Sequence, residues 1–210
     1  MKENDEELSN NELNNNIKII LLGESGTGKT NLISVYLGNN FSNYSSTISS
    51  TFSQKTIVVN DNKYFIDIWD TMGQEKYRTL TKNFIRGSQI VIFVYDITNK
   101  YSFDELNYWV NCVKEELSYK PVLGLAANKI DLFENETVSQ KEGEEYAQKI
   151  GALFEETSAK ENPDGFKNYV KNLIEKLLLE KNCIINGSDI ATYKTLNKKV
   201  HKKDKKKKFC

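Results

Sequence analysis

The octapeptide at residues 23–30, Gly-Glu-Ser-Gly-Thr-Gly-Lys-Thr, constrains the fold of this chain more than any other feature. It fits the pattern G-x-x-x-x-G-K-[ST]. It follows a β-branched run at residues 17–22, which predicts a buried strand, and precedes Leu32, Ile33 and Leu37, which have helical spacing. A glycine-rich turn in this setting favours a phosphate-binding loop, because backbone N–H groups and the helix N-terminus face the phosphate. An incidental glycine-rich turn is the less favoured interpretation.

The loop supplies groups for a nucleoside triphosphate and for a metal ion. Four of its residues would surround a phosphate with their backbone: Ser25, Gly26, Thr27 and Gly28. Lys29 would reach the β- and γ-phosphates, and the Thr30 hydroxyl would ligate Mg²⁺. Alone, the motif indicates only a nucleoside triphosphatase or kinase.

Short apolar runs predict five further strands: residues 56–59, 63–69, 90–95, 122–127 and 152–154. An Asn-Asp-Asn turn joins the first two and favours a hairpin. Helical patterns alternate with the others, so we expect an α/β fold, with a mostly parallel sheet, helices on both faces and one antiparallel edge strand. Ligands bind such sheets beyond the carboxyl ends of the strands, where polar loops follow Leu22, Trp69, Ala127 and Phe154.

Helix boundaries are indicated by two capping boxes. The sequence Ser-Phe-Asp-Glu at 102–105 predicts a helix that Ser102 caps, with apolar residues on one face from Phe103 to Leu117. Ser-x-x-Glu at 139–142 predicts one that ends near residue 150. A last amphipathic helix is predicted over residues 166–178. Residues 38–52 are polar and aperiodic and predict a long loop, which in a compact domain is usually functional.

A second polar loop, which starts at Asp70, suits the metal and the γ-phosphate. Asp70 ends an apolar strand, where a carboxylate can serve a metal ion beside a phosphate loop. Gly73 could present its backbone N–H to a γ-phosphate, and Gln74 could orient water. The alternative is a polar turn.

Two further loops suit a guanine base. The Asp131 carboxylate can accept two hydrogen bonds from guanine, which adenine cannot offer, while Asn128 can tie neighbouring loops together and Lys129 can lie over the base. Ser158, Ala159 and Lys160 follow the last strand and could present backbone N–H groups to the guanine oxygen. Each peptide alone could equally be a solvated turn.

Together these loops resemble the small GTPases of the Ras superfamily, and within it the Rab family. GESGTGKT, WDTMGQEKYRTL, NKID and ETSAK correspond to the four nucleotide motifs, and FVYDITNKYSF is also similar to Rab proteins. The resemblance covers about residues 17–180. It implies a P-loop GTPase domain with a six-stranded sheet, five helices and a GTP/GDP switch that hydrolyses GTP slowly. The Asn-Lys-x-Asp motif argues against a P-loop nucleotide kinase.

The resemblance also implies roles for individual residues. Asp131 would select guanine, and Gln74 would orient the catalytic water, with Lys29 and Gly73 at the phosphates. Thr47 would ligate Mg²⁺ and sense the γ-phosphate, while Phe41 would stack on the guanine edge, unless it is only a hydrophobic anchor. An exchange factor, a GTPase activator and effectors in vesicle traffic would bind residues 41–52 and 70–80.

The two switch segments depart from the family pattern. Ser49 and Thr51 replace a glycine and an acidic residue, and Met72 stands where alanine is usual. Thr47 lies 18 residues after Lys29, one fewer than expected for the family. These changes leave effector specificity and the hydrolysis rate open, so the alternative is a nucleotide-binding module with little or no turnover.

Charge is balanced overall but not along the chain. Lys and Arg number 29 and Asp and Glu number 29, a net charge of +0. Residues 1–16 carry five acidic residues against one lysine, a net −4, and residues 194–210 carry nine lysines against one aspartate, a net +8. We therefore expect a disordered acidic extension over 1–16, a GTPase domain over 17–180 and a flexible tail over 181–210, without nucleic-acid binding.

The tail suggests attachment to a membrane. It ends in a lysine run and Cys210, which resembles a prenylation site, although nothing follows the cysteine as in a C-a-a-X motif. The alternative is an unmodified basic tail. A prenylated tail implies residence on the cytoplasmic face of an intracellular membrane, with a cytosolic pool held by a lipid-shielding partner. Three cysteines without a CxxC pair indicate a reducing compartment.

Overall fold

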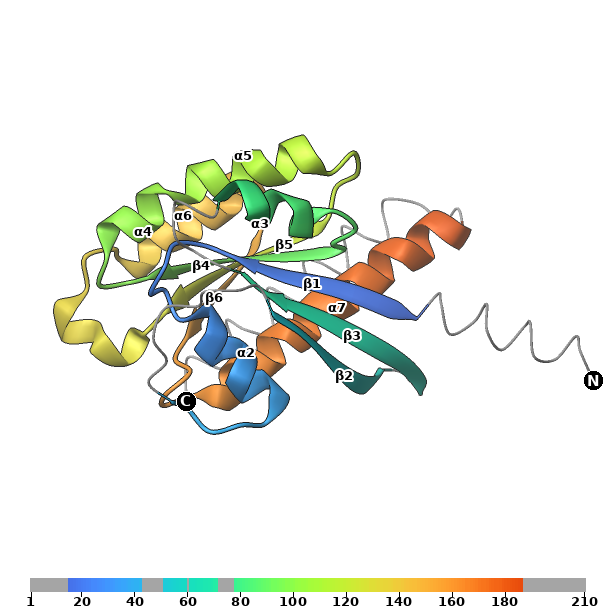
Figure 1. Cartoon of the computed structure of the whole chain (residues 1–210), viewed down its shortest axis with the longest axis horizontal. Coiled ribbons are helices and arrows are strands. Elements are labelled where there is room, and N and C mark those ends of the chain that lie inside the picture. The colour runs from blue at the N-terminus through green and yellow to red at the C-terminus, as the bar shows by residue number, and fades with distance from the viewer. Residues whose placement is uncertain (1–14, 43–50, 60, 72–77, 187–210) are drawn as a thin grey trace, which may run out of the picture. The chain divides into compact units, whose positions relative to one another are not determined.

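The computed structural model describes residues 15–42, 51–59, 61–71 and 78–186 (Figure 1). The chain forms two compact units, Met1–Leu173 and Ile174–Cys210. The first unit contains the β-sheet. Of the second unit, the structure describes residues 174–186, which are helical.

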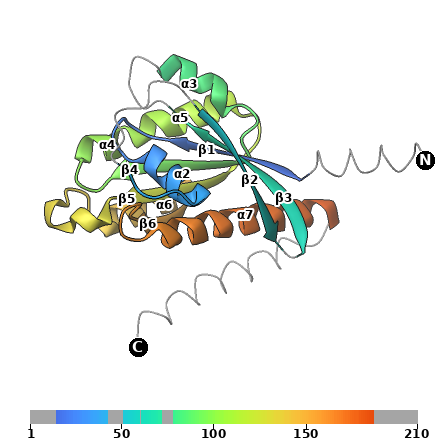
Figure 2. The same ribbon diagram turned by 60° about the horizontal axis from the view of Figure 1, so that its bottom comes forward.

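One six-stranded sheet organises the first unit. Its strands are β1 (Asn16–Leu22), β2 (Thr51–Val59), β3 (Asn62–Asp70), β4 (Ile90–Asp96), β5 (Val122–Asn128) and β6 (Leu153–Thr157). Their order is β2-β3-β1-β4-β5-β6, and only β2 runs antiparallel to its neighbour. The β2–β3 hairpin forms one edge of the sheet (Figure 2). The expected fold class, with its hairpin and its single antiparallel edge strand, is confirmed.

The helices are α2 (Lys29–Leu37), α3 (Arg78–Ile85), α4 (Lys100–Asp104), α5 (Leu106–Glu116), α6 (Gln140–Ile150) and α7 (Pro163–Asn186), with a 3₁₀ segment, η2 (Ile130–Asn135). Figure 1 shows α3, α4, α5 and α6 on one side of the sheet and α2 on the other. Tyr36 of α2 contacts Phe166 at the start of α7, with ring centroids 6.4 Å apart. Helices on both faces explain why every residue of the central strand β4 is buried.

The predicted cap at Ser102 is wrong, and the helix predicted to follow it is interrupted. Asn99, not Ser102, caps the first helix, which begins at Lys100, and Glu105 separates α4 from α5. The Ser102 hydroxyl is buried instead: it donates to the Asn99 carbonyl at 2.7 Å and accepts from the backbone N–H of Asp96 at 3.0 Å. Serine therefore closes the turn after β4 and cannot cap a helix there.

The second capping box is confirmed. Ser139 caps α6, since its hydroxyl accepts from the Glu142 N–H, and the Glu142 carboxylate accepts from the Ser139 N–H. Other elements differ from expectation. The strand β2 begins at Thr51, inside the segment predicted to be a loop, because residues 51–59 pair with β3 along their whole length. The helix α3 corresponds to no predicted element.

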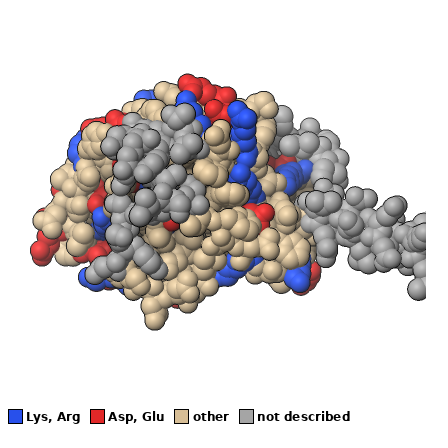
Figure 3. Space-filling model, viewed as in Figure 1, with Lys and Arg blue, Asp and Glu red and all other residues tan. Residues whose placement is uncertain are grey.

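Acidic and basic side chains are interspersed on the face in Figure 3, and they gather at its upper edge over the ends of α3 and α5. Lys82 of α3 pairs with Glu115 of α5 at 2.9 Å, and Arg86, directly after α3, pairs with Glu116 of α5 at 3.1 Å. Exposed pairs of this kind contribute only about 0–1 kcal/mol each. Within the described ranges, none of the helices combines the length and the apolar character needed to cross a bilayer.

Candidate functional site

The loop between β1 and α2 is shaped by its glycines. Gly28 has a φ of 93°, which places it in the left-handed region. A Cβ at Gly28 would collide with the side-chain amide of Asn128, and a Cβ at Gly23 would collide with the Val94 carbonyl. The sequence G-x-x-x-x-G is thus required by close packing of this loop against β4 and the end of β5.

Lys29 is buried at the start of α2 and points back into the loop. Its ammonium donates to the carbonyls of Gly23 at 2.7 Å and Glu24 at 2.8 Å. Burial lowers the pKa of Lys29 to about 8, while the carboxylates of Asp70 and Glu24 oppose this shift. A phosphate in the loop would give this buried ammonium the counter-charge that its surroundings only partly supply.

Asp70 lies beside Thr30, at the end of β3. The Thr30 hydroxyl donates to Asp70 Oδ2 at 2.7 Å. Asp70 is buried, and its second oxygen, Oδ1, has no hydrogen-bond partner among the described residues. Burial raises the pKa of Asp70, against the hydrogen bond from Thr30 and the charge of Lys29. A buried, unpaired carboxylate oxygen beside a hydroxyl suits a divalent cation with oxygen ligands, directly or through water.

Thr71 fixes the start of the loop after β3. Its buried hydroxyl donates to the Leu21 carbonyl on β1 at 2.6 Å. The next two predicted site residues, Gly73 and Gln74, lie outside the described residues, as do Met72 and Thr47. Phe41 is described and is 39% exposed, and its proposed stacking on the base stays a prediction.

Asn128 joins three segments at the end of β5. Its amide nitrogen donates to the Thr27 carbonyl at 2.8 Å, and its amide oxygen accepts from the Thr157 hydroxyl at 3.2 Å. Asn128 is 2% exposed. The phosphate loop, β5 and β6 are therefore tied together through one buried amide, across 101 and 29 residues of sequence.

The residues around Asn128 are also held in place. Lys129 has a φ of 67°, unusual for a side-chain-bearing residue, and its ammonium forms an ion pair with Asp96 Oδ2 at 2.7 Å. The buried Ser158 hydroxyl donates to Asp131 Oδ1 at 2.6 Å. Ala159 is buried and Lys160 is exposed. Among the described residues, those predicted to form the site follow β1, β3, β5 and β6 and thus lie along one edge of the sheet.

Comparison with known proteins shows the family of the chain. A family model described as "Ras family" matches residues 18–179. The chain belongs to the Ras family, in its Rab branch. It is 41% identical over 164 residues to "Ras-related protein Rab-18" of Lymnaea stagnalis, covering 77% of this chain and 80% of the relative.

Two further relatives carry Rab names. "Ras-related protein Rab-5A" of Dictyostelium discoideum is 40% identical over 154 residues, which are 70% of this chain and 77% of the relative. "Ras-related protein Rab5A" of Oryza sativa subsp. japonica is 40% identical over 146 residues, which are 69% and 72%. This Rab-family protein is therefore a guanine-nucleotide-binding enzyme that hydrolyses GTP, with the regulators, effectors and intracellular membrane association typical of Rab proteins in vesicle traffic.

Two contacts of the candidate site were not predicted from the sequence. The Trp109 indole of α5 donates to Glu24 Oε1 at 3.1 Å, and both side chains are buried. Asp96, at the end of β4, holds Lys129. The available signals were two acidic residues: Glu24 inside the phosphate loop and Asp96 at the end of an apolar strand. Neither signal indicates which distant residue completes the contact.

Proposed function

We propose that the loops at the carboxyl edge of the sheet form a guanine-nucleotide site with Mg²⁺, and that this site works as a GTP/GDP switch. The observation that carries the proposal is the buried Oδ1 of Asp70, which has no hydrogen-bond partner in the described part of the chain and lies beside Thr30 and Lys29. A cation and an anionic phosphate together satisfy both the carboxylate and the ammonium. No other ligand class suits the two groups at once so directly.

Thr30 and Asp70 would hold Mg²⁺, and Thr47 would become a further ligand when GTP is bound. The ion, when bound, neutralises charge on the phosphate oxygens. Lys29 would stabilise the same charge from within the loop, which surrounds the phosphates with the backbone of residues 25–28. Gly73 would donate its N–H to the γ-phosphate, and Gln74 would orient the attacking water. Catalysis in this scheme is positioning and charge stabilisation.

The guanine base would be read by Asp131. Ser158 supports this role, because its hydrogen bond occupies only Oδ1 of Asp131 and holds the carboxylate in one orientation. Lys129, anchored by Asp96, would lie over the base. Backbone N–H groups of Ala159 and Lys160 would face the guanine oxygen, and Phe41 would stack on the edge of the base.

The test is nucleotide competition on the full chain with a fluorescent GDP analogue. GDP and GTP should displace the analogue, ATP should not, and Asp131→Asn should shift the preference toward xanthine nucleotides. Glu134→Gln, on the exposed part of the same loop, is the matched control and should leave the preference unchanged. Displacement by ATP at the concentration effective for GDP would refute the guanine assignment.

Turnover separates the switch from the alternative of a binding module with little hydrolysis. Single-turnover hydrolysis of bound GTP, with and without a candidate activator, measures it directly. A rate that an activator cannot raise would favour the module. Effectors, an exchange factor and an activator would bind residues 41–52 and 70–80, the segments whose contacts would depend on the γ-phosphate.

We also propose that the tail anchors the protein on the cytoplasmic face of an intracellular membrane. A single lipid chain binds membranes only marginally, so a prenyl group on Cys210 and the lysine run at 205–208 would act together. A lipid-shielding partner would maintain the cytosolic pool. Cell fractionation tests this: Cys210→Ser should become soluble, and its retention in the membrane fraction would refute the anchor.

A further inference from the structure

The phosphate loop carries an acidic side chain near its start. Glu24 is 6% exposed, and its carboxylate belongs to a loop that we propose to bind phosphates, where a further negative charge is unfavourable. The indole N–H of Trp109, on α5, donates to Glu24 Oε1 at 3.1 Å. Trp109 is also buried. A buried carboxylate of the loop is thus bound by a donor from a helix 85 residues further along the chain.

The main chain of Glu24 is a centre of contacts within the loop. Its carbonyl accepts from the Thr27 hydroxyl at 2.9 Å and from the Lys29 ammonium at 2.8 Å. The second acceptor of that ammonium is the carbonyl of the preceding residue, Gly23, at 2.7 Å. Lys29 is the residue that we expect to reach the phosphates, so the position of its ammonium depends on where Glu24 lies. A contact that fixes the Glu24 side chain therefore also helps to position Lys29.

Two other anchors hold the loop, and both come from strands. Gly23 lies against the Val94 carbonyl of β4, and the Asn128 amide of β5 donates to the Thr27 carbonyl. The helix α5 lies on the side of the sheet that carries α3, α4 and α6 (Figure 1). The Glu24–Trp109 hydrogen bond therefore adds an anchor from the helical layer that covers the sheet.

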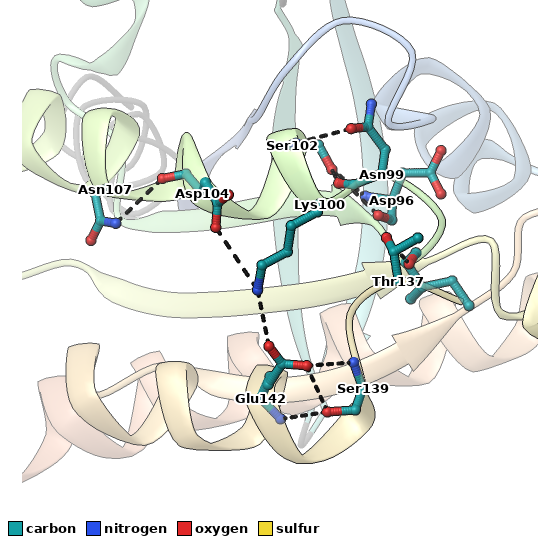
Figure 4. Close-up of polar contacts among 10 residues, drawn as sticks. Asp96, Asn99, Lys100, Ser102, Asp104, Asn107, Thr137, Ser139 and Glu142 are labelled. Carbon is teal, nitrogen blue, oxygen red and sulfur yellow. Dashed lines mark hydrogen bonds and ion pairs between the residues drawn. The ribbon is translucent and has the colours of Figure 1, made fainter. Parts of the chain in front are cut away.

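The chain that leads into α5 is itself held by the polar contacts in Figure 4. The buried Ser102 hydroxyl accepts from the Asp96 backbone N–H at 3.0 Å and closes the turn after β4. The Asn107 side chain, in the first turn of α5, donates to the Asp104 carbonyl at 3.3 Å. Trp109 follows two residues later. The indole is thus presented to the loop from a helix whose start has its own contacts.

We propose that Trp109 is a positioning residue for the guanine nucleotide, which acts through the Glu24 carboxylate to hold the phosphate loop in its binding conformation. This role rests on the nucleotide site proposed above, and Trp109 itself need not contact the nucleotide. The alternative is a purely structural role, in which the indole fills the core and its N–H finds an acceptor, as in most buried tryptophans. The two roles differ in what happens to bound nucleotide when the hydrogen bond is removed and the packing is kept.

The experiment compares two substitutions of Glu24 that remove its charge and keep its approximate size. Glu24→Gln retains an oxygen that can accept from the indole, whereas Glu24→Met offers only a weakly accepting sulfur atom. Release of a fluorescent GDP analogue from the full chain, with Mg²⁺ present, is followed by stopped-flow mixing with excess GDP. We expect release from Glu24→Met to be about tenfold faster than from Glu24→Gln, which corresponds to the loss of one buried hydrogen bond.

The indole N–H resonance of Trp109 gives a second readout, which a purely structural role would not link to nucleotide release. The chain has two tryptophans, so Trp69→Phe leaves Trp109 as the single source of an indole signal. In proton–nitrogen correlation spectra of this variant, the hydrogen-bonded indole proton should lie downfield. It should stay downfield when Glu24→Gln is added and move upfield when Glu24→Met is added. The order of these shifts should match the order of the release rates.

Leu117→Ala is the matched control for packing. Leu117 is buried at the end of α5, about two turns beyond Trp109. Its truncation should lower the thermal midpoint, as Trp109→Phe should, but it should leave release within about twofold of the parent rate because the two sites are independent. Trp109→Phe should accelerate release. Adding Glu24→Met to it should bring little further acceleration, because both substitutions remove the same bond.

Three results would overturn the proposal: equal release from Glu24→Met and Glu24→Gln, full additivity of Trp109→Phe and Glu24→Met, or acceleration by Leu117→Ala as large as that by Trp109→Phe. Each would assign the indole to packing alone. Failure of the parent protein to bind GDP is a different result, because it would refute the nucleotide site itself. Retention of bound GDP by the parent, together with fast release from Glu24→Met only, supports the positioning role.

Discussion

Replacing Asn128 with alanine isolates the contact that ties the phosphate loop to the base-reading segment. The substitution removes the amide that donates to the Thr27 carbonyl at 2.8 Å and accepts from Thr157 at 3.2 Å. The Thr157 hydroxyl retains a second contact, to the Ala127 carbonyl at 3.3 Å. The Thr27 carbonyl, by contrast, loses this side-chain donor, so the loss falls mainly on the phosphate loop.

The size of the effect follows from that imbalance. Leaving one buried backbone acceptor without its donor costs about 1–3 kcal/mol. Every 1.4 kcal/mol corresponds to about tenfold in an equilibrium constant. If this cost destabilises the loop conformation that binds the phosphates, GDP should bind roughly 5- to 150-fold more weakly. Since association of a small nucleotide should change less than its release, most of this loss should appear in the dissociation rate.

The assay is release of a fluorescent GDP analogue, measured by stopped-flow mixing with excess GDP. Thr157→Val is the matched control, because it removes the other hydrogen bond to Asn128 and leaves the Thr27 contact intact. It should change release by less than about threefold. Equal acceleration by both variants would show that Asn128 acts through β6 instead of the phosphate loop. Unchanged release in Asn128→Ala would refute the tether itself.

Four further predictions concern catalysis, the charge of Lys29, the α6 cap and the charge of Glu142. Gln74→Leu should reduce activator-stimulated GTP hydrolysis with little change in GTP affinity, which single-turnover and binding measurements separate; equal rates would mean that Gln74 does not orient water. The pKa of Lys29 is about 8, and a bound phosphate favours the charged form. GDP affinity should therefore fall as the pH rises above about 8. In isothermal titrations, Lys29→Met should remove this pH dependence. Ser139→Ala should lower the free energy of unfolding by about 1 kcal/mol through loss of the α6 cap. The pKa of Glu142 is lowered to about 2 by Lys100 and Ser139, so its contribution to stability is present above its unfolded pKa and is lost as pH falls toward 2; a loss centred well above the unfolded pKa would contradict this origin.

The elements that sequence predicted best are those whose local pattern and tertiary setting agree. The central strands are continuous apolar runs because helices cover both faces of the sheet. A run such as 90–95 therefore predicts a buried strand from the sequence alone. The Ser139 capping box is satisfied within four residues and was visible from sequence. Ser102 has the same local signature, but its hydroxyl is used by Asp96 and Asn99, a choice made by the turn after β4.

The candidate site divides in the same way. The phosphate loop is one contiguous segment, and the positions of its glycines predict its conformation. Contacts that cross the fold are invisible in any local window: Trp109 and Glu24 are 85 residues apart, and Asn128 and Thr27 are 101 apart. The helix α3 has no local signal comparable to a capping box, and its ion pairs with α5 appear only after both helices are placed.

The polar groups that have partners, and those that have none, indicate which part of the site distinguishes GTP from GDP. On the base side, Asn128, Lys129 and Asp131 each have a short, specific partner in the structure. On the phosphate side, Asp70 keeps a buried oxygen that has no hydrogen-bond partner among the described residues, and burial lowers the pKa of Lys29. Groups that are already satisfied can bind GDP and GTP equally well, because nothing about the base differs between them. A difference in free energy between the two nucleotides must come from groups whose cost the third phosphate and its metal relieve. Discrimination between GDP and GTP should therefore be altered by changes at Asp70 and Lys29, whereas changes on the base side should shift the affinity for both nucleotides together.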